Sequence, residues 1–242
     1  MGDVQEGAKV VLGSKHAARE SKRRLAGNEI RAIYDRLWKA YGPQRWWPAD
    51  TATEVVLGAI LTQNTAWTNV ERAIEVLRDA HCLTWEALRH VSVERLAEYV
   101  RPSGTYRVKA ARLKAFVDCL WAGHDGDLSR LLGGSLDEAR GRLLSISGIG
   151  PETADAILLY AGERPSFVVD AYTKRILRRH GVIGKSATYE EVRTLFHEAL
   201  ADDAVMFNEF HALLVALGKK HCRSRALCDG CPLENLPHDA AL

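Results

Sequence analysis

The segment SISGIGPETADAILLY at residues 145–160 constrains the fold more than any other part of this 242-residue chain. Gly148 and Gly150 stand one residue apart, and Pro151 and a run of helix-forming residues follow them. Proline is favoured at the first position of a helix, and glycines allow a tight turn whose N–H groups can approach a phosphate closely. The segment therefore predicts a helix-hairpin-helix over residues 136–162, although an ordinary helical hairpin is an equally good interpretation of the turn alone.

Apolar residues recur at helical spacing through nearly the whole chain. The expected helices cover residues 28–41, 51–61, 67–79, 84–99, 106–122, 136–146, 151–162, 170–180, 188–201 and 205–220. Strand alternation is limited to PSFVV at 165–169, which is too short to build a sheet. An all-α fold is expected, preceded by a basic tail over residues 1–27 that has no periodic apolar face and is expected to be disordered.

Composition and charge narrow the class of protein. With 47% apolar residues the chain can bury a core, and its apolar windows are too short to span a bilayer. Five cysteines, three of them within residues 222–231, suit a reducing compartment and a metal site better than disulfides. We therefore expect a cytoplasmic protein without membrane contacts. Four clusters of lysine and arginine favour a nucleic-acid partner, although each cluster alone could be a solvated helix face.

Asp170 ends a short apolar run and begins an expected helix, so its simplest role is that of a helix N-cap. The wider context adds a second role. LLSISGIGPETADAILLYA followed by FVVDAYTKRIL resembles the hairpin, Gly/Pro loop and catalytic aspartate of the endonuclease III superfamily of DNA glycosylases, and the resemblance runs from about residue 28 to residue 231. It implies that Asp170 stabilises an oxocarbenium-like sugar and that Gly148, Gly150 and Thr153 contact the DNA backbone.

The resemblance also implies an architecture. Two helical subdomains would flank a DNA-binding cleft. A six-helix barrel over residues 46–164 would contain the hairpin, and residues 28–45 plus 165–242 would form the second subdomain. The target base would be flipped out of a double-stranded DNA duplex, and a monomer is the expected form.

Glu152 occupies the position at which bifunctional members of the superfamily carry a lysine that forms a Schiff base. A carboxylate cannot form that imine, so the resemblance implies a monofunctional glycosylase that leaves an abasic site without AP lyase activity. As an alternative interpretation, Glu152 simply interacts well with the positive end of its helix.

The segment RWWPADTATEVVLGAILTQNTAWTNV at 45–70 resembles the 3-methyladenine DNA glycosylase III branch of the superfamily. The resemblance implies that Gln63 is the wedge that fills the gap left by the flipped nucleotide, and that Trp46, Trp47 and Trp67 line the base pocket. Indole faces would favour a cationic alkylated purine by about 1–2 kcal/mol. The three tryptophans could instead be core residues.

This branch can also use a lysine late in the chain. Lys219 is our candidate for that pocket residue, Lys220 is the alternative, and either could equally be a surface cation.

The C-terminal cysteines resemble the superfamily's iron–sulfur loop, which has six, two and five residues between four cysteines. Here Cys222, Cys228 and Cys231 are separated by five and then two residues, and Pro237 stands where the fourth cysteine is expected. His238 could complete the site. A [4Fe-4S] cluster is the favoured interpretation, a zinc site or a loop that binds nothing remain alternatives, and the glycosylase chemistry needs none of them.

The sequence thus predicts a base excision repair glycosylase for alkylated purines such as 3-methyladenine. Two alternatives stay open. One is a glycosylase for a mismatched or deaminated base such as uracil, thymine or adenine, which would need hydrogen-bonding groups in the pocket. The other is a non-catalytic lesion-binding protein, for which Asp170 would have no purpose near anionic DNA.

Overall fold

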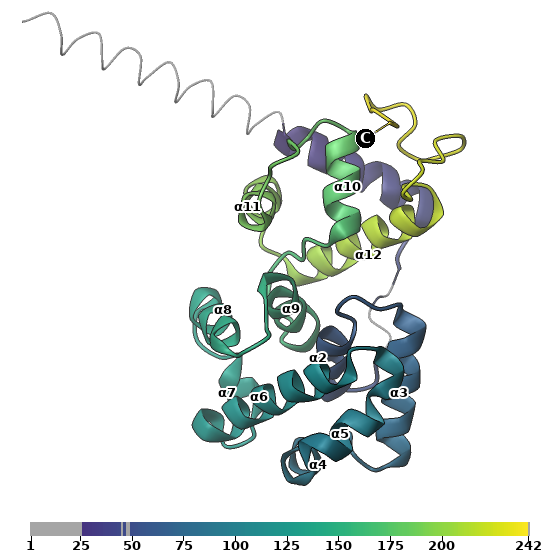
Figure 1. Ribbon diagram of the computed structural model, residues 1–242. Helices are drawn as coiled ribbons and strands as arrows, with labels where there is room; N and C mark the ends of the chain where they lie inside the picture. Colours follow the sequence, from purple (N-terminus) through teal and green to yellow (C-terminus); the bar gives the residue numbers. More distant parts are fainter. Residues whose placement is uncertain (1–25, 45, 47–48, 242) are drawn as a thin grey trace, which may run out of the picture. The chain divides into compact units, whose positions relative to one another are not determined.

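The computed structural model describes residues 26–44, 46 and 49–241. These residues form helices joined by turns and loops, and no strand occurs among them (Figure 1). The expected disordered tail over residues 1–27 lies outside the described residues except for its last two positions. No helix of the described part is long and apolar enough to cross a membrane.

The chain divides into two compact units. The first comprises the described parts of residues 1–45 and 209–242 together with residues 169–203, and the second comprises the described part of residues 46–168 together with residues 204–208. Residues 204–208 belong to the second unit, where Phe207 packs edge to face against Phe167 with ring centroids 5.3 Å apart.

The second unit is built around α2 (Ala52–Leu61), which is buried from Glu54 to Leu61. A helix that is apolar on all sides needs neighbours on all sides. Here α3 (Trp67–Asp79), α6 (Tyr106–His124), α9 (Pro151–Ala156) and its continuation η2 (Ile157–Ala161) contact α2 (Figure 1). Thr51 caps the start of α2 by accepting a hydrogen bond from the Glu54 N–H.

Two local expectations are corrected. The single helix predicted over residues 84–99 is two helices, α4 (Trp85–His90) and α5 (Val93–Tyr99), because Val91 is extended and the Ser92 side chain caps a new start at the Arg95 N–H. A short helix that the sequence did not predict, α7 (Leu128–Leu131), follows Asp127, whose carboxylate caps it. In both places a capping side chain determines where a helix begins. A 3₁₀ turn, η1 (Arg101–Ser103), separates α5 from α6.

The predicted hairpin is present as α8 (Leu136–Ser145) followed by α9 (Pro151–Ala156), which continues as one π-helical turn, η2 (Ile157–Ala161). The two helices are joined by a buried ion pair. Arg140 of α8 donates two hydrogen bonds of 2.8 and 3.0 Å to Asp155 of α9, and Ser166 donates a third. Asp155 is fully buried, so these contacts hold the hairpin rigid from within the unit.

The first unit contains a helix over residues 26–41, α10 (Ala171–Arg179), α11 (Tyr189–Ala199) and most of α12 (Ala204–Lys220). Its core includes an aromatic cluster, in which the Phe210 ring lies 5.1 Å from Tyr34 and 5.4 Å from Phe196. After α12 the chain forms an irregular loop over residues 221–241 that contains the three clustered cysteines.

Candidate functional site

The two glycines of the hairpin turn have different reasons to be glycine. Gly148 has a φ of +85°, a conformation that side chains with a Cβ rarely adopt, whereas Gly150 has ordinary extended angles of −92° and 176°. A Cβ at Gly148 would also lie 2.3 Å from Cγ of Arg112. Among the residues that the structure describes, a Cβ at Gly150 would meet nothing within 4 Å. The expectation that both glycines are needed for backbone freedom is therefore corrected for Gly150, where only an external ligand could require the missing side chain.

The N-terminus of α9 has no side-chain cap, and Gly150 is its N-cap residue. Among the described residues, no capping side chain thus accepts a hydrogen bond from the first N–H groups of this helix, and helix N-termini of this kind bind anions. Glu152 is exposed in the first helical turn, where its negative charge interacts favourably with the helix dipole.

Gln63, the predicted wedge, lies in the loop between α2 and α3 and is held at the hairpin turn. Its amide nitrogen donates to Thr153 Oγ1 at 2.9 Å and to the Gly148 carbonyl at 3.3 Å, and its amide oxygen accepts a hydrogen bond from Arg112. Thr153, a predicted backbone contact, is 6% exposed. Its hydroxyl thus supports Gln63, and only its backbone N–H remains for the predicted DNA contact.

The structure describes two of the three predicted pocket tryptophans. Trp46 and Trp67 are both half-buried, and Trp67 is the first residue of α3. The indole nitrogen of each is inaccessible to solvent, so the rings present their apolar parts at the surface. Trp47 lies outside the described residues.

Asp170 lies in the first unit and is the N-cap of α10, as its position in the sequence predicts. Its Oδ1 accepts a hydrogen bond of 2.7 Å from the Thr173 N–H, while Oδ2 lies 3.8 Å from Nε2 of His211 on α12. His211 is 6% exposed. Burial lowers the pKa of His211, and the Asp170 carboxylate opposes that shift only in part. The carboxylate therefore faces a largely neutral imidazole near pH 7.

Lys219 and Lys220 end α12 and are both exposed. The ammonium of Lys220 lies 4.5 Å from the centroid of the Tyr41 ring, a cation–π contact on the surface of the first unit. Lys219 remains a predicted pocket residue.

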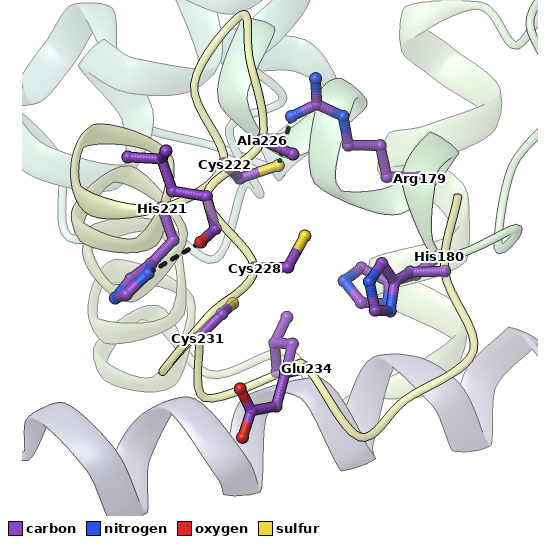
Figure 2. Close-up of a pocket in the computed structure, with 11 residues that line it drawn as sticks. Arg179, His180, His221, Cys222, Ala226, Cys228, Cys231 and Glu234 are labelled. Carbon is purple, nitrogen blue, oxygen red and sulfur yellow. Dashed lines mark hydrogen bonds between the residues drawn. The ribbon is translucent and has the colours of Figure 1, made fainter. Parts of the chain in front are cut away.

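The cysteine loop lines a small hollow with a cavity volume of about 20 Å³. Figure 2 shows the sulfur atoms of Cys222, Cys228 and Cys231 on one side of this hollow and His180 on the other. Burial raises the pKa of Cys231, and the neighbouring sulfurs of Cys228 and Cys222 raise it further. Cysteine sulfur is a preferred ligand of soft metals and iron–sulfur clusters, but it binds as the thiolate, which a raised pKa disfavours.

Arginines and backbone carbonyls organise the same loop. Arg179 donates to Cys222 Sγ at 3.2 Å and to the carbonyls of Arg223 and Ser224. His238, the predicted fourth ligand, has Nδ1 2.8 Å from the Leu236 carbonyl. Across the described residues, no three or more cysteine, histidine or acidic side chains are arranged to hold a metal ion. The three thiols share a hollow, but with His238 they are not a formed ligand set, so no chemical step is assigned to a cluster.

Sequence reasoning did not single out Arg112, which it counted only among a basic cluster, or the buried pair of Arg140 and Asp155. Arg112 had one available signal, because it belongs to a run of cations on one helix, YRVKAARLK. The pairing of Arg140 with Asp155 had none, because it depends on how α8 packs against α9.

Comparisons with known proteins agree with this geometry. Residues 57–202 match the HhH-GPD superfamily of base excision DNA repair proteins. The chain belongs to this superfamily. Its fold is therefore the all-α helix-hairpin-helix fold of endonuclease III-like proteins, as the sequence predicted.

Individual known proteins resemble the chain over most of its length. "Putative DNA repair glycosylase MJ1434" of Methanocaldococcus jannaschii is 47% identical over 207 residues, which cover 85% of this chain and 94% of that protein. The Helicobacter pylori 3-methyladenine DNA glycosylase MagIII, solved with 1,N6-ethenoadenine, is 28% identical with a TM-score of 0.69, covering 81% of this chain and 97% of that one. An endonuclease III–DNA complex has a TM-score of 0.76 at 20% identity, covering 89% and 96%, and supports the fold alone.

Proposed function

We propose that this HhH-GPD protein is a monofunctional DNA glycosylase. It would act as a monomer on double-stranded DNA, flip out an N-alkylated purine such as 3-methyladenine, and hydrolyse its N-glycosidic bond to leave an abasic site. Membership of a DNA glycosylase superfamily and the hairpin geometry support the general activity. The absence of strand cleavage and the choice of base are the parts that need experiments.

The observation that carries the monofunctional assignment is Glu152. It stands in the first turn of α9, directly after the hairpin turn, at the position where the resemblance places the nucleophilic lysine of lyases. A carboxylate has no amine with which to attack the sugar, so base loss must depend on water. Asp170 supplies the negative charge that stabilises the developing oxocarbenium ion, and its partly exposed side chain, at 15%, leaves room for contact with a substrate.

The choice of an alkylated purine is supported by two observations. The protein that shares 28% identity and a TM-score of 0.69 with this chain is a 3-methyladenine DNA glycosylase. Trp46 and Trp67, by their half-buried positions, could offer a ring face to a base. A base that already carries positive charge is attracted to an aromatic face and also has a weakened glycosidic bond.

One panel of substrates tests both parts. Duplexes that contain 3-methyladenine, 7-methylguanine, hypoxanthine, uracil or a G·T mismatch are incubated with the protein and analysed with and without alkaline cleavage. We expect excision of the alkylated purines, strand breaks only after alkali, and no borohydride-trapped adduct. Preferred excision of uracil would overturn the substrate assignment, and a trapped adduct would overturn the monofunctional one.

The tryptophans sharpen the substrate test. In Trp46→Leu, excision of 3-methyladenine should fall about tenfold because the leucine keeps apolar contact but offers no aromatic face to the cation. A neutral base accepted by the same pocket should lose less. If Trp46→Leu instead melts early and keeps the wild-type ratio between charged and neutral substrates, Trp46 is a core residue.

A further inference from the structure

The side-chain amide of Gln63 has every polar atom engaged within the second unit. Its nitrogen uses two donors, on Thr153 Oγ1 and on the Gly148 carbonyl, and its oxygen accepts from Arg112 Nη1. An amide with both ends engaged has a fixed orientation. The residue predicted to enter the DNA is therefore placed by the hairpin turn and by one arginine of α6.

Arg112 lies directly against the hairpin turn. Atoms Cγ, Cδ and Nε of its side chain occupy the space beside Gly148 where a Cβ would stand, at 2.3, 2.7 and 2.7 Å. The missing side chain of Gly148 thus allows the arginine stem to cross the turn. The guanidinium consequently lies next to the turn that precedes the uncapped N-terminus of α9.

The guanidinium has capacity for a second acceptor. Arginine has five N–H donors, and Gln63 is its one hydrogen-bond acceptor among the residues that the structure describes. The positive charge of the guanidinium also favours a phosphate.

We propose that Arg112 is a positioning residue that bridges a DNA phosphate at the hairpin turn to the Gln63 side chain. One N–H of the guanidinium holds the Gln63 amide oxygen, and the others bind a phosphate oxygen at the hairpin turn. Binding of the DNA backbone thereby sets the position of the group that fills the gap in the duplex. This inference rests on the proposed glycosylase function, in which Gln63 replaces a flipped nucleotide.

The test measures backbone binding and nucleotide flipping separately, in Arg112→Met and in Arg112→Lys. The probe is a duplex that carries 2-aminopurine beside a tetrahydrofuran abasic analogue. Its affinity is measured against salt concentration, and its fluorescence at saturating protein reports the open duplex. Neither measurement needs excision, so failure of the alkylpurine assignment leaves the test intact.

Arg112→Met should reduce the salt slope of binding by about one, because one phosphate contact is lost. It should also reduce the open-duplex equilibrium by about tenfold, as expected for loss of a hydrogen bond to a charged group. Arg112→Lys should keep most of the salt slope and restore little of the opening, since an ammonium lacks the fork that can hold two acceptors. Arg107→Met is the matched control, because Arg107 is exposed on the same helix beside the Tyr106 ring, and it should leave the opening unchanged.

A double-mutant cycle with Gln63→Ala decides whether Arg112 acts through Gln63. In the Gln63→Ala background, Arg112→Met should still reduce the salt slope but lower the opening by less than twofold. A full tenfold loss in that background would overturn the bridge and leave Arg112 as a phosphate contact alone. An unchanged salt slope would overturn the phosphate contact. Side-chain amide NMR signals of Gln63 in the DNA-free protein provide a readout without DNA, and an unshifted signal in Arg112→Met would also contradict the proposal.

Discussion

Two helices of this protein have N-cap residues with almost the same backbone dihedral angles, but only one of them is capped by a side chain. Gly150, the N-cap of α9, has angles of −92° and 176°, and Asp170, the N-cap of α10, has −89° and −177°. At α10 the aspartate accepts the Thr173 N–H, whereas at α9 no side chain caps the helix. The start of α10 therefore uses a carboxylate as the acceptor for one of its N–H groups, whereas the start of α9 has no side-chain cap among the described residues, as is typical of helix N-termini that bind anions.

The two helix starts therefore suit ligands of opposite charge. A duplex brings phosphate anions, which suit the uncapped α9, and a breaking glycosidic bond creates positive charge on the sugar, which suits the carboxylate that caps α10. Under the proposed function, the same local geometry would serve DNA binding in one unit and catalysis in the other. Three of the four experiments below change one side of this comparison at a time, and the other tests whether the cysteine loop takes part in the chemistry.

The largest effect is expected at Asp170. Asp170→Asn should lower the rate of base excision about a hundredfold or more, because the negative charge that stabilises the sugar cation is lost. Asparagine caps a helix about as well as aspartate, so the melting temperature and the affinity for duplex should change little. Single-turnover excision and thermal melting measure the two effects. Excision at nearly the wild-type rate would mean that Asp170 is only a cap.

The second experiment changes the α9 side. Gly150→Ala introduces no backbone strain and no contact within the protein, so its melting temperature should stay close to wild type. Its affinity for any duplex, damaged or not, should nevertheless fall about tenfold, because the methyl group occupies the space in which a phosphate approaches. Gly148→Ala is the matched variant, and it should lose stability through its φ of +85° and its clash with Arg112. Wild-type affinity in Gly150→Ala would place the DNA elsewhere.

The contrast also marks what a sequence can and cannot predict. Glycine, proline and the spacing of apolar residues are local signals, so the hairpin, the all-α class and the Asp170 cap could be predicted from the amino-acid sequence. The break between α4 and α5 did not, because one capping serine outweighed a continuous apolar pattern. The partners of Gln63 could not be predicted either, since Gly148 and Arg112 are far from it in sequence and meet it only through packing.

The third experiment concerns the cysteine loop, which sequence analysis connected with a cluster and which the proposed chemistry does not use. Protein purified without oxygen should contain iron and absorb near 400 nm if the prediction is correct, and Cys228→Ser should remove both. Because Asp170 does not depend on the loop for its hydrogen bond to Thr173, excision by the folded variant should fall only a few fold. Iron-free protein with full activity would refute the cluster. If Cys228→Ser lowered excision as much as Asp170→Asn does, the cysteine loop would have to take part in the chemistry.

The smallest expected effect is a pH dependence of stability at His211, the residue that faces the second oxygen of Asp170. Burial lowers the pKa of this histidine below its ordinary value of 6.5 in the folded protein, and the neighbouring carboxylate only partly reverses the shift. Above about pH 6.5 the imidazole is neutral in both the folded and the unfolded chain and does not affect the balance. As the pH falls below that value, the unfolded chain binds a proton that the folded protein does not, so the free energy of unfolding decreases until the folded pKa is reached.

One such histidine changes the free energy of unfolding by at most about 1.4 kcal/mol per pH unit. His211→Gln should therefore make the decline between pH 6.5 and 5 shallower when urea unfolding is measured at several pH values. His180→Gln provides the comparison, because burial lowers the pKa of His180 as well but that residue has the Pro237 carbonyl as its partner instead of Asp170. Only His211→Gln should also alter the pH profile of excision, since only His211 faces the carboxylate that caps α10. If His211→Gln and His180→Gln had the same pH profile of excision, His211 would have no influence on Asp170. The starts of α9 and α10 would then differ only in their capping residues.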